Sequence, residues 1–149
     1  MKLEEEIKQK KFRNVYHKLA INLVYTTNWL NEFSNSFLKK FELTQQQFNI
    51  LRILRGQYPN PASVKLLVER MLDKQCDASR MIERLRLKGL LERKECPMNR
   101  RQVDIVITDA GLNLLAEIDK KQDEWDEVLK GLTTEEVEQL SDLLDKLRG

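Results

Sequence analysis

The sequence has little of the chemistry that most enzymes and metal sites require. It contains one histidine, His17, and two cysteines, Cys76 and Cys96, which do not form a CxxC pair. Structural zinc is held by four ligands, mostly Cys and His, so this composition nearly excludes such a site. A glycine-rich phosphate loop and a nucleophile motif are also missing. We therefore expect no enzyme activity, cofactor or metal ion, although Asp and Glu are plentiful enough for a site built from carboxylates alone.

Long apolar runs are missing as well. No stretch approaches the roughly 20 apolar residues that cross a bilayer. The first six residues, MKLEEE, are acidic and lack the apolar segment of a secretory signal. These absences predict a cytoplasmic protein without membrane contact. The chain of 149 residues is 41% hydrophobic and 34% charged. This length and composition predict one folded domain, 1–149, with a substantial core.

Charge is unevenly distributed along the chain. Residues 74–101 carry nine Lys and Arg against four Asp and Glu, whereas residues 102–149 carry five against thirteen. A basic central segment predicts a polyanionic partner, and an acidic C-terminal third predicts a segment kept away from that partner.

The first half of the chain shows helical periodicity interrupted by turn signals. Apolar residues at helical spacing predict one long helix over residues 7–40, with a break near Asn28 or Asn35. A capping box, Thr44 with Gln47, predicts the start of a second helix that ends near residue 56. The turn YPNPAS follows, and either Asn60 or Ser63 caps a short helix reaching residue 72.

The next segment combines another helix with a hairpin. The pattern predicts a helix over residues 74–88, ended by Gly89, because glycine adopts the left-handed conformation at least cost. Residues 90–94 and 101–108 are predicted strands, since Val103, Ile105 and Ile107 alternate with their neighbours. Arg100 and Arg101 are predicted to lie at the exposed tip between these strands.

Two helices are predicted to end the chain. Thr108 is expected to cap a long helix over about residues 109–130, which ends before Gly131. A second capping box, Thr133 with Glu136, begins the last helix. That helix carries an apolar stripe formed by Val137, Leu140, Leu144 and Leu147.

The order of these elements is typical of a winged helix-turn-helix: two short helices, the second followed by a β-hairpin. The expected fold class is therefore mainly α with a small β-hairpin wing, flanked by N- and C-terminal dimerisation helices. The DNA-binding lobe would cover about residues 43–108, and the dimerisation lobe residues 1–40 and 109–149. The apolar stripes of the terminal helices must be buried, either across a dimer interface or back on their own subunit.

Several polar side chains are predicted to contact DNA. Inward placement of Ala78, Met81, Ile82 and Leu85 would leave the polar face of the 74–88 helix outside. Gln75, Ser79 and Arg80 could then hydrogen-bond base edges in the major groove. Lys74 and the helix amides would favour a phosphate. The candidate DNA-binding residues, which include three on the wing, are Lys74, Gln75, Ser79, Arg80, Arg84, Lys94, Arg100 and Arg101.

On the wing, Arg101 is the first candidate to enter a narrow minor groove, and Lys94 and Arg100 are placed on phosphates. The alternative is that the helix face is simply solvated and that the arginines only aid solubility. A different alternative function is a winged-helix protein–protein interaction module without DNA binding.

Three stretches resemble the MarR family (multiple antibiotic resistance regulators): LTQQQFNILRIL, SRMIERLRLKGLLER and MNRRQVDIVITDAGLNLL. The resemblance runs over about residues 43–115. It implies a transcriptional regulator, expected to be a repressor, whose homodimer binds a palindromic operator in double-stranded DNA. It also places Arg101 at the wing position that enters the minor groove. In the family an Asp two residues earlier holds that guanidinium, whereas this chain has Asn99.

The resemblance further implies an effector. Family members commonly lose operator affinity when a small, often aromatic, molecule binds between the dimer helices and the winged domain. Tyr16, His17, Tyr25 and Trp29 lie on the helix that would line such a cleft, although aromatic residues at helical spacing are more often core.

A redox switch is a further alternative, because helix amides and Lys74 could lower the pKa of Cys76.

Overall fold

The computed structural model describes the backbone of residues 1–149 and every side chain except that of Arg100. The chain forms two compact units, Met1–Gln45 and Gln46–Gly149, and each is described by itself. Within the described residues, no helix has both the length and the apolar character needed to span a membrane. The same residues contain no cluster of three His, Cys, Asp or Glu side chains able to hold a metal ion.

The N-terminal unit contains a short helix, α1 (Leu3–Glu6), and a long one, α2 (Val15–Lys39). The prediction of a single helix from residue 7 was wrong. Asn14 is extended, and its side chain accepts a hydrogen bond from the backbone N–H of His17 at 2.9 Å, so the long helix begins at this cap. The helix then runs through Asn28 and Asn35 without the expected break.

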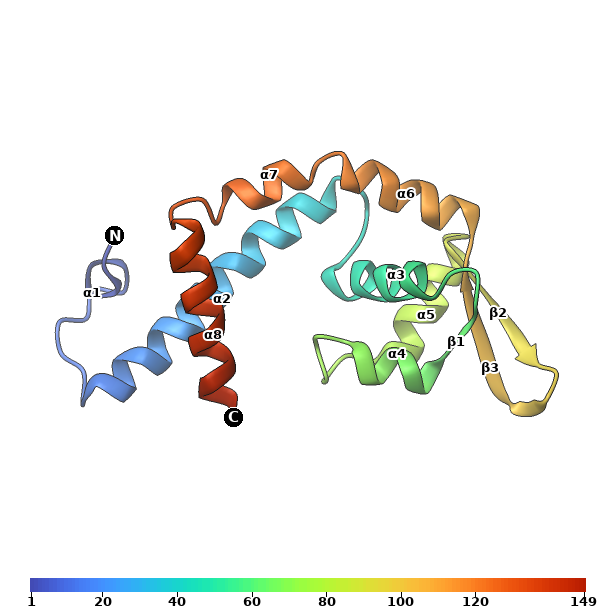
Figure 1. Ribbon diagram of the computed structural model, residues 1–149, viewed down its shortest axis with the longest axis horizontal. Coiled ribbons are helices and arrows are strands. Elements are labelled where there is room, and N and C mark those ends of the chain that lie inside the picture. The colour runs from blue at the N-terminus through green and yellow to red at the C-terminus, as the bar shows by residue number, and fades with distance from the viewer. The chain divides into compact units, whose positions relative to one another are not determined.

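Three helices form the base of the winged helix-turn-helix (Figure 1): α3 (Gln45–Gln57), α4 (Val64–Arg70) and α5 (Ala78–Leu87). Thr44 precedes α3 as predicted, and of the two candidate caps for α4 the structure uses Ser63, whose hydroxyl accepts from the Leu66 N–H at 3.1 Å. Fully buried side chains from all three helices and from α6 make the core: Ile50, Leu51, Leu54, Leu67, Ile82, Leu85, Leu115 and Ile118.

A three-stranded antiparallel sheet, in the order β1–β3–β2, completes this unit. The hairpin strands are β2 (Leu91–Cys96) and β3 (Asn99–Ile107), and both are longer than predicted. The strand β1 (Ala62–Ser63) was not predicted, because it has two residues and pairs with Ile105 and Asp104 far along the chain. Ile105 and Ile107 are buried, as their alternation predicted.

Three helices follow the wing: α6 (Asp109–Asp119), α7 (Gln122–Glu127) and α8 (Thr134–Arg148). Thr108 caps α6, and Thr133 with Glu136 forms the predicted capping box of α8. The single helix expected over residues 109–130 was wrong, since α6 ends at Asp119 and α7 begins after Lys121. The predicted fold class, mainly α with a small wing, is confirmed.

Candidate nucleic-acid interface

The second helix of the helix-turn-helix begins later than the sequence predicted. Asp77 caps α5, and its side chain accepts from the Arg80 N–H at 3.1 Å. Lys74 and Gln75 therefore lie in the turn between α4 and α5, not on the helix, which corrects their predicted placement. A carboxylate is a good acceptor for hydrogen bonds from the free N–H groups of a first helical turn. Asp77 is therefore a favourable cap for α5.

The polar face of α5 is exposed as expected. Ala78, Ile82 and Leu85 are buried, whereas the side chains of Ser79, Arg80 and Arg84 are exposed to solvent. Serine and arginine at successive positions of one exposed helix face offer donors and acceptors that match base edges. This face is the part of the unit best suited to read a groove.

The turn before α5 is held by side chains of α3 and by its own Lys74. Asn49 accepts the Leu72 N–H at 2.9 Å, and Gln46 donates to Asp73 at 3.2 Å. The ammonium group of Lys74 donates to the backbone carbonyls of Glu69 and Val68 at the end of α4. Lys74 thus caps the preceding helix, in addition to the phosphate contact that remains a prediction for it.

Cys76 lies in the same turn, half-buried. Burial, followed by the negative charges of Asp73 and Asp77, raises the pKa of its thiol above the ordinary value. The expectation that Lys74 and helix amides would lower this pKa was wrong, because burial and the two aspartates act in the opposite direction. A raised pKa leaves less thiolate, so the basis for a redox switch at Cys76 is lost.

The wing brings its cations to the start of β3. The connection between the strands is the two residues Pro97 and Met98, so Arg100 and Arg101 lie on β3 and not in the tip itself. Glu95 pairs with Val103 whereas Cys96 pairs with Asn99, which leaves residues 100–102 as an irregularity in β3.

Asn99 acts on the backbone of this irregularity. Its side-chain oxygen accepts a hydrogen bond from the backbone N–H of Arg101 at 3.0 Å, which holds the backbone at this point. Asn99 therefore binds the backbone of Arg101 and not its guanidinium, which is exposed. Lys94 is exposed and lies 3.7 Å from Glu92. The side chain of Arg100 lies outside the described residues.

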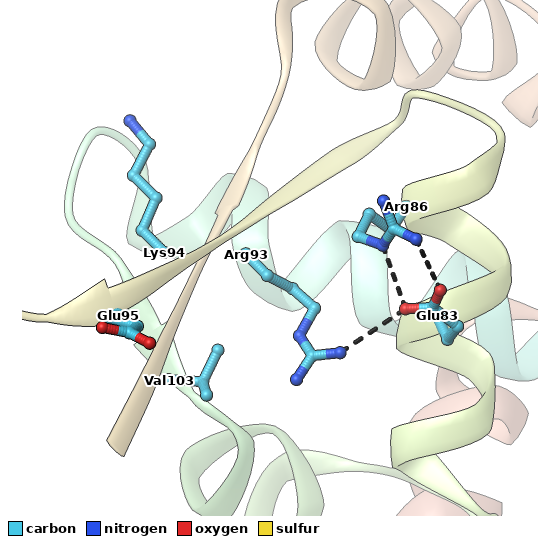
Figure 2. A pocket seen from close by; sticks show the side chains of 6 residues that line it. All are labelled: Glu83, Arg86, Arg93, Lys94, Glu95 and Val103. Atoms are coloured by element: carbon cyan, nitrogen blue, oxygen red, sulfur yellow. Dashed lines mark hydrogen bonds and ion pairs between the residues drawn. The ribbon is translucent and has the colours of Figure 1, made fainter. Parts of the chain in front are cut away.

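Three charged residues between α5 and the wing were not predicted as part of the site (Figure 2). Glu83 accepts from Arg86 at 2.6 and 3.0 Å and from Arg93 on β2 at 3.4 Å. The hydrogen bonds from Arg86, and then the one from Arg93, hold the pKa of the Glu83 carboxyl below its ordinary value, and Glu83 raises the pKa of Arg86. The pair three residues apart on α5 could have been found from spacing; the bond to Arg93 depends on the fold.

These side chains line an open groove of about 530 Å³ between α5 and the inner face of the wing. The lining residues are Glu83, Arg86, Arg93, Lys94, Glu95 and Val103. Three cations against two carboxylates give the groove a net positive lining, next to the helix face described above.

Comparison with known proteins agrees with this architecture. Residues 43–103 match the model of the MarR family. An uncharacterized HTH-type transcriptional regulator from Bacillus cereus is 37% identical over 75 residues, and the match spans half of each chain. The regulator MgrA from Staphylococcus aureus is 27% identical over 135 residues, 90% of each chain.

The solved structures agree as well. The crystal structure of a MarR transcription factor from Planctomyces limnophilus superposes with a TM-score of 0.70 at 29% identity, over 91% of this chain and 98% of that one. The sequence and structure comparisons thus both find transcription regulators, and the matched segment contains the winged helix from α3 to the first half of β3. Residues 43–103 of this chain are thus similar to the MarR family in sequence, and its fold matches that of a MarR transcription factor of known structure.

Proposed function

We propose that this protein is a DNA-binding transcriptional regulator, a repressor that binds a palindromic operator as a homodimer. The observation that carries the proposal is the exposed face of α5, with Ser79, Arg80 and Arg84, beside a wing that carries Lys94 and Arg101. These five residues lie in the segment, residues 43–103, that matches the MarR family. A helix and a wing that both carry cations suit two adjacent grooves of one duplex.

Each predicted contact residue has a role in this proposal. Ser79 and Arg80 hydrogen-bond base edges in the major groove, and Gln75 reaches the same bases from the turn. Arg84 and Lys74 are placed on phosphates. On the wing, Arg101 enters the minor groove, while Lys94 and Arg100 bind phosphates on its flanks.

The homodimer is proposed from apolar faces that remain exposed in the single chain. On α8, Val137, Leu140, Leu143 and Leu147 are 42–56% exposed. On α2, Val15 is 74% exposed. Amphipathic helices bury their apolar faces, so we propose that residues 1–40 and 109–149 form a dimerisation lobe and residues 43–108 the DNA-binding lobe.

Release by a small aromatic effector is proposed with this function. Tyr16, Tyr25 and Trp29 on α2 are all exposed, between 37% and 77%. Flat side chains of this kind suit stacking on an aromatic ring. A screen of aromatic acids and phenols for loss of DNA binding tests this part of the proposal. If no compound in the set weakened DNA binding, the proposed effector would be contradicted.

Selection of bound sites from random duplexes tests the proposed function. We expect a palindrome with half-sites about one helical turn apart, because a two-fold dimer presents two α5 helices to one face of the duplex. Retention of no duplex at low salt would contradict DNA binding and favour a winged-helix protein–protein interaction module.

On the selected operator, Lys94→Gln and Arg100→Gln should each lower the slope of log affinity against log salt by about one. The loss should be similar on every duplex, because phosphate contacts carry no sequence information. Lys120→Gln, just after α6, removes a charge ion-paired to Glu117; it is the matched control and should leave the slope unchanged. Affinity that does not depend on salt would contradict the scheme.

A further inference from the structure

The groove between α5 and the wing has one cation that bridges its two walls. Arg93 lies on β2 opposite Ile105, two residues after buried Leu91, so it continues the face of the sheet that packs on α5. Figure 2 shows its side chain reaching from the strand toward Glu83 on the helix. Among the described side chains, this ion pair joins helix α5 to the wing.

The Arg93 guanidinium is held by Glu83 and has further N–H donors. Its Nη1 donates to Glu83 Oε2 at 3.4 Å, and an arginine side chain has five N–H donors. The side chain remains 45% exposed. Glu83 already accepts two shorter hydrogen bonds from Arg86, so its single negative charge is shared by two cations. Arg93 therefore keeps donors and positive charge to offer to a second anion.

The position of the groove identifies that anion. When a helix occupies the major groove and its wing the neighbouring minor groove, the sugar-phosphate strand that separates these grooves must pass between helix and wing. The groove lined by Arg86, Arg93 and Lys94 lies in that place.

We propose that Arg93 binds a phosphate of the DNA strand that passes between α5 and the wing, and that Glu83 is the positioning residue that aims its guanidinium. The inference rests on the proposed function, and it adds a contact that ties the α5 helix, the wing and the DNA backbone together. Arg93 supplies a charge-assisted hydrogen bond, the stronger class of such bonds.

Arg93→Gln tests the contact on the operator selected above. Operator affinity should fall roughly 10-fold to 100-fold, the value of one hydrogen bond to a charged group, and the salt slope should fall by about one. The melting curve should move by no more than a few degrees, because exposed ion pairs contribute little to stability. Lys120→Gln again serves as the control for the loss of one positive charge. An unchanged salt slope in Arg93→Gln would overturn the contact.

Glu83→Gln tests the positioning role by the sign of its effect. Removing a negative charge beside DNA should strengthen binding if only net charge matters. If Glu83 aims Arg93, Glu83→Gln should instead weaken operator binding several-fold. In an Arg93→Gln background the same substitution should no longer weaken binding, because no guanidinium is left to position. Tighter binding by Glu83→Gln in the wild-type background would overturn the positioning role.

The two proposals fail in different ways. If the wild-type protein binds no duplex, the proposed function fails. If the wild type binds a selected palindrome with a steep salt dependence and Arg93→Gln behaves in the same way, only the inference about the groove fails.

Discussion

Gly111→Ala is expected to lower the free energy of unfolding of the winged helix by about 1–3 kcal/mol, the usual range for overpacking of a well-packed core. A Cβ at this position would lie 2.4 Å from the backbone oxygen of Leu90 and 2.6 Å from Cγ1 of Ile107. The Leu90 oxygen also accepts the Thr108 N–H at 3.1 Å, where the hairpin meets α6. Because a backbone oxygen cannot rotate away as a flexible side chain can, the helix must move off the sheet.

Gly56→Ala is the matched control and should have the opposite sign. Gly56 lies near the end of α3, and a Cβ added there would meet nothing within 4 Å. Alanine restricts the unfolded chain more than glycine does and favours helix, so the protein should gain roughly 0.5–1 kcal/mol. Urea unfolding of both variants, at several protein concentrations to separate folding from association, measures the difference. Equal stability of the two variants would show that α6 is not seated tightly on the hairpin.

Local signals in the sequence predicted the elements that are capped by their own neighbours. Thr133 with Glu136 begins α8, and Thr108 begins α6, at the residues expected from the sequence. Such caps join residues three positions apart, so the pattern contains all the information needed. Gly89, with φ of +74°, ends the α5 segment in the left-handed conformation that few other residues adopt.

The errors arose where a competing cap or a distant partner decides the structure. Asp77 caps α5, but the polar segment 73–77 offers two aspartates, and spacing alone did not choose between them. The predicted helix ran through Asn14, because the apolar residues on either side of it are spaced as in one continuous helix. The pairing of β1 with Ile105, and of Glu83 with Arg93, joins residues that only the folded chain brings together.

The candidate site was predictable in composition but not in geometry. The basic segment and its exposed α5 face were expected from the residues. The irregularity at residues 100–102 was not, because it depends on the register between β2 and β3. At the position where the resemblance led us to expect an aspartate, Asn99 accepts a hydrogen bond from the backbone N–H of Arg101 two residues later.

The combined substitution Arg80→Ala and Arg101→Ala is expected to have the largest effect on DNA binding. Arg80 is on the exposed face of α5 and Arg101 on the wing, so the two side chains are proposed to enter different grooves. A good base contact is worth about 1–3 kcal/mol, and contributions from independent contacts add. The double variant should therefore lose roughly 30-fold to 10⁴-fold in operator affinity.

The two single variants should differ in what they lose. Arg80→Ala should relax specificity at one base pair of each half-site, because it removes donors to a base edge. Arg101→Ala should reduce the preference for a narrow, A/T-rich minor groove beside the half-site, since that groove concentrates the negative potential that attracts guanidinium. Affinities on the palindrome and on single-base variants of it, at fixed salt, separate the two losses. If the double variant bound no more weakly than either single variant, Arg80 and Arg101 would not contact the duplex independently, and the placement of helix and wing in neighbouring grooves would have to be abandoned.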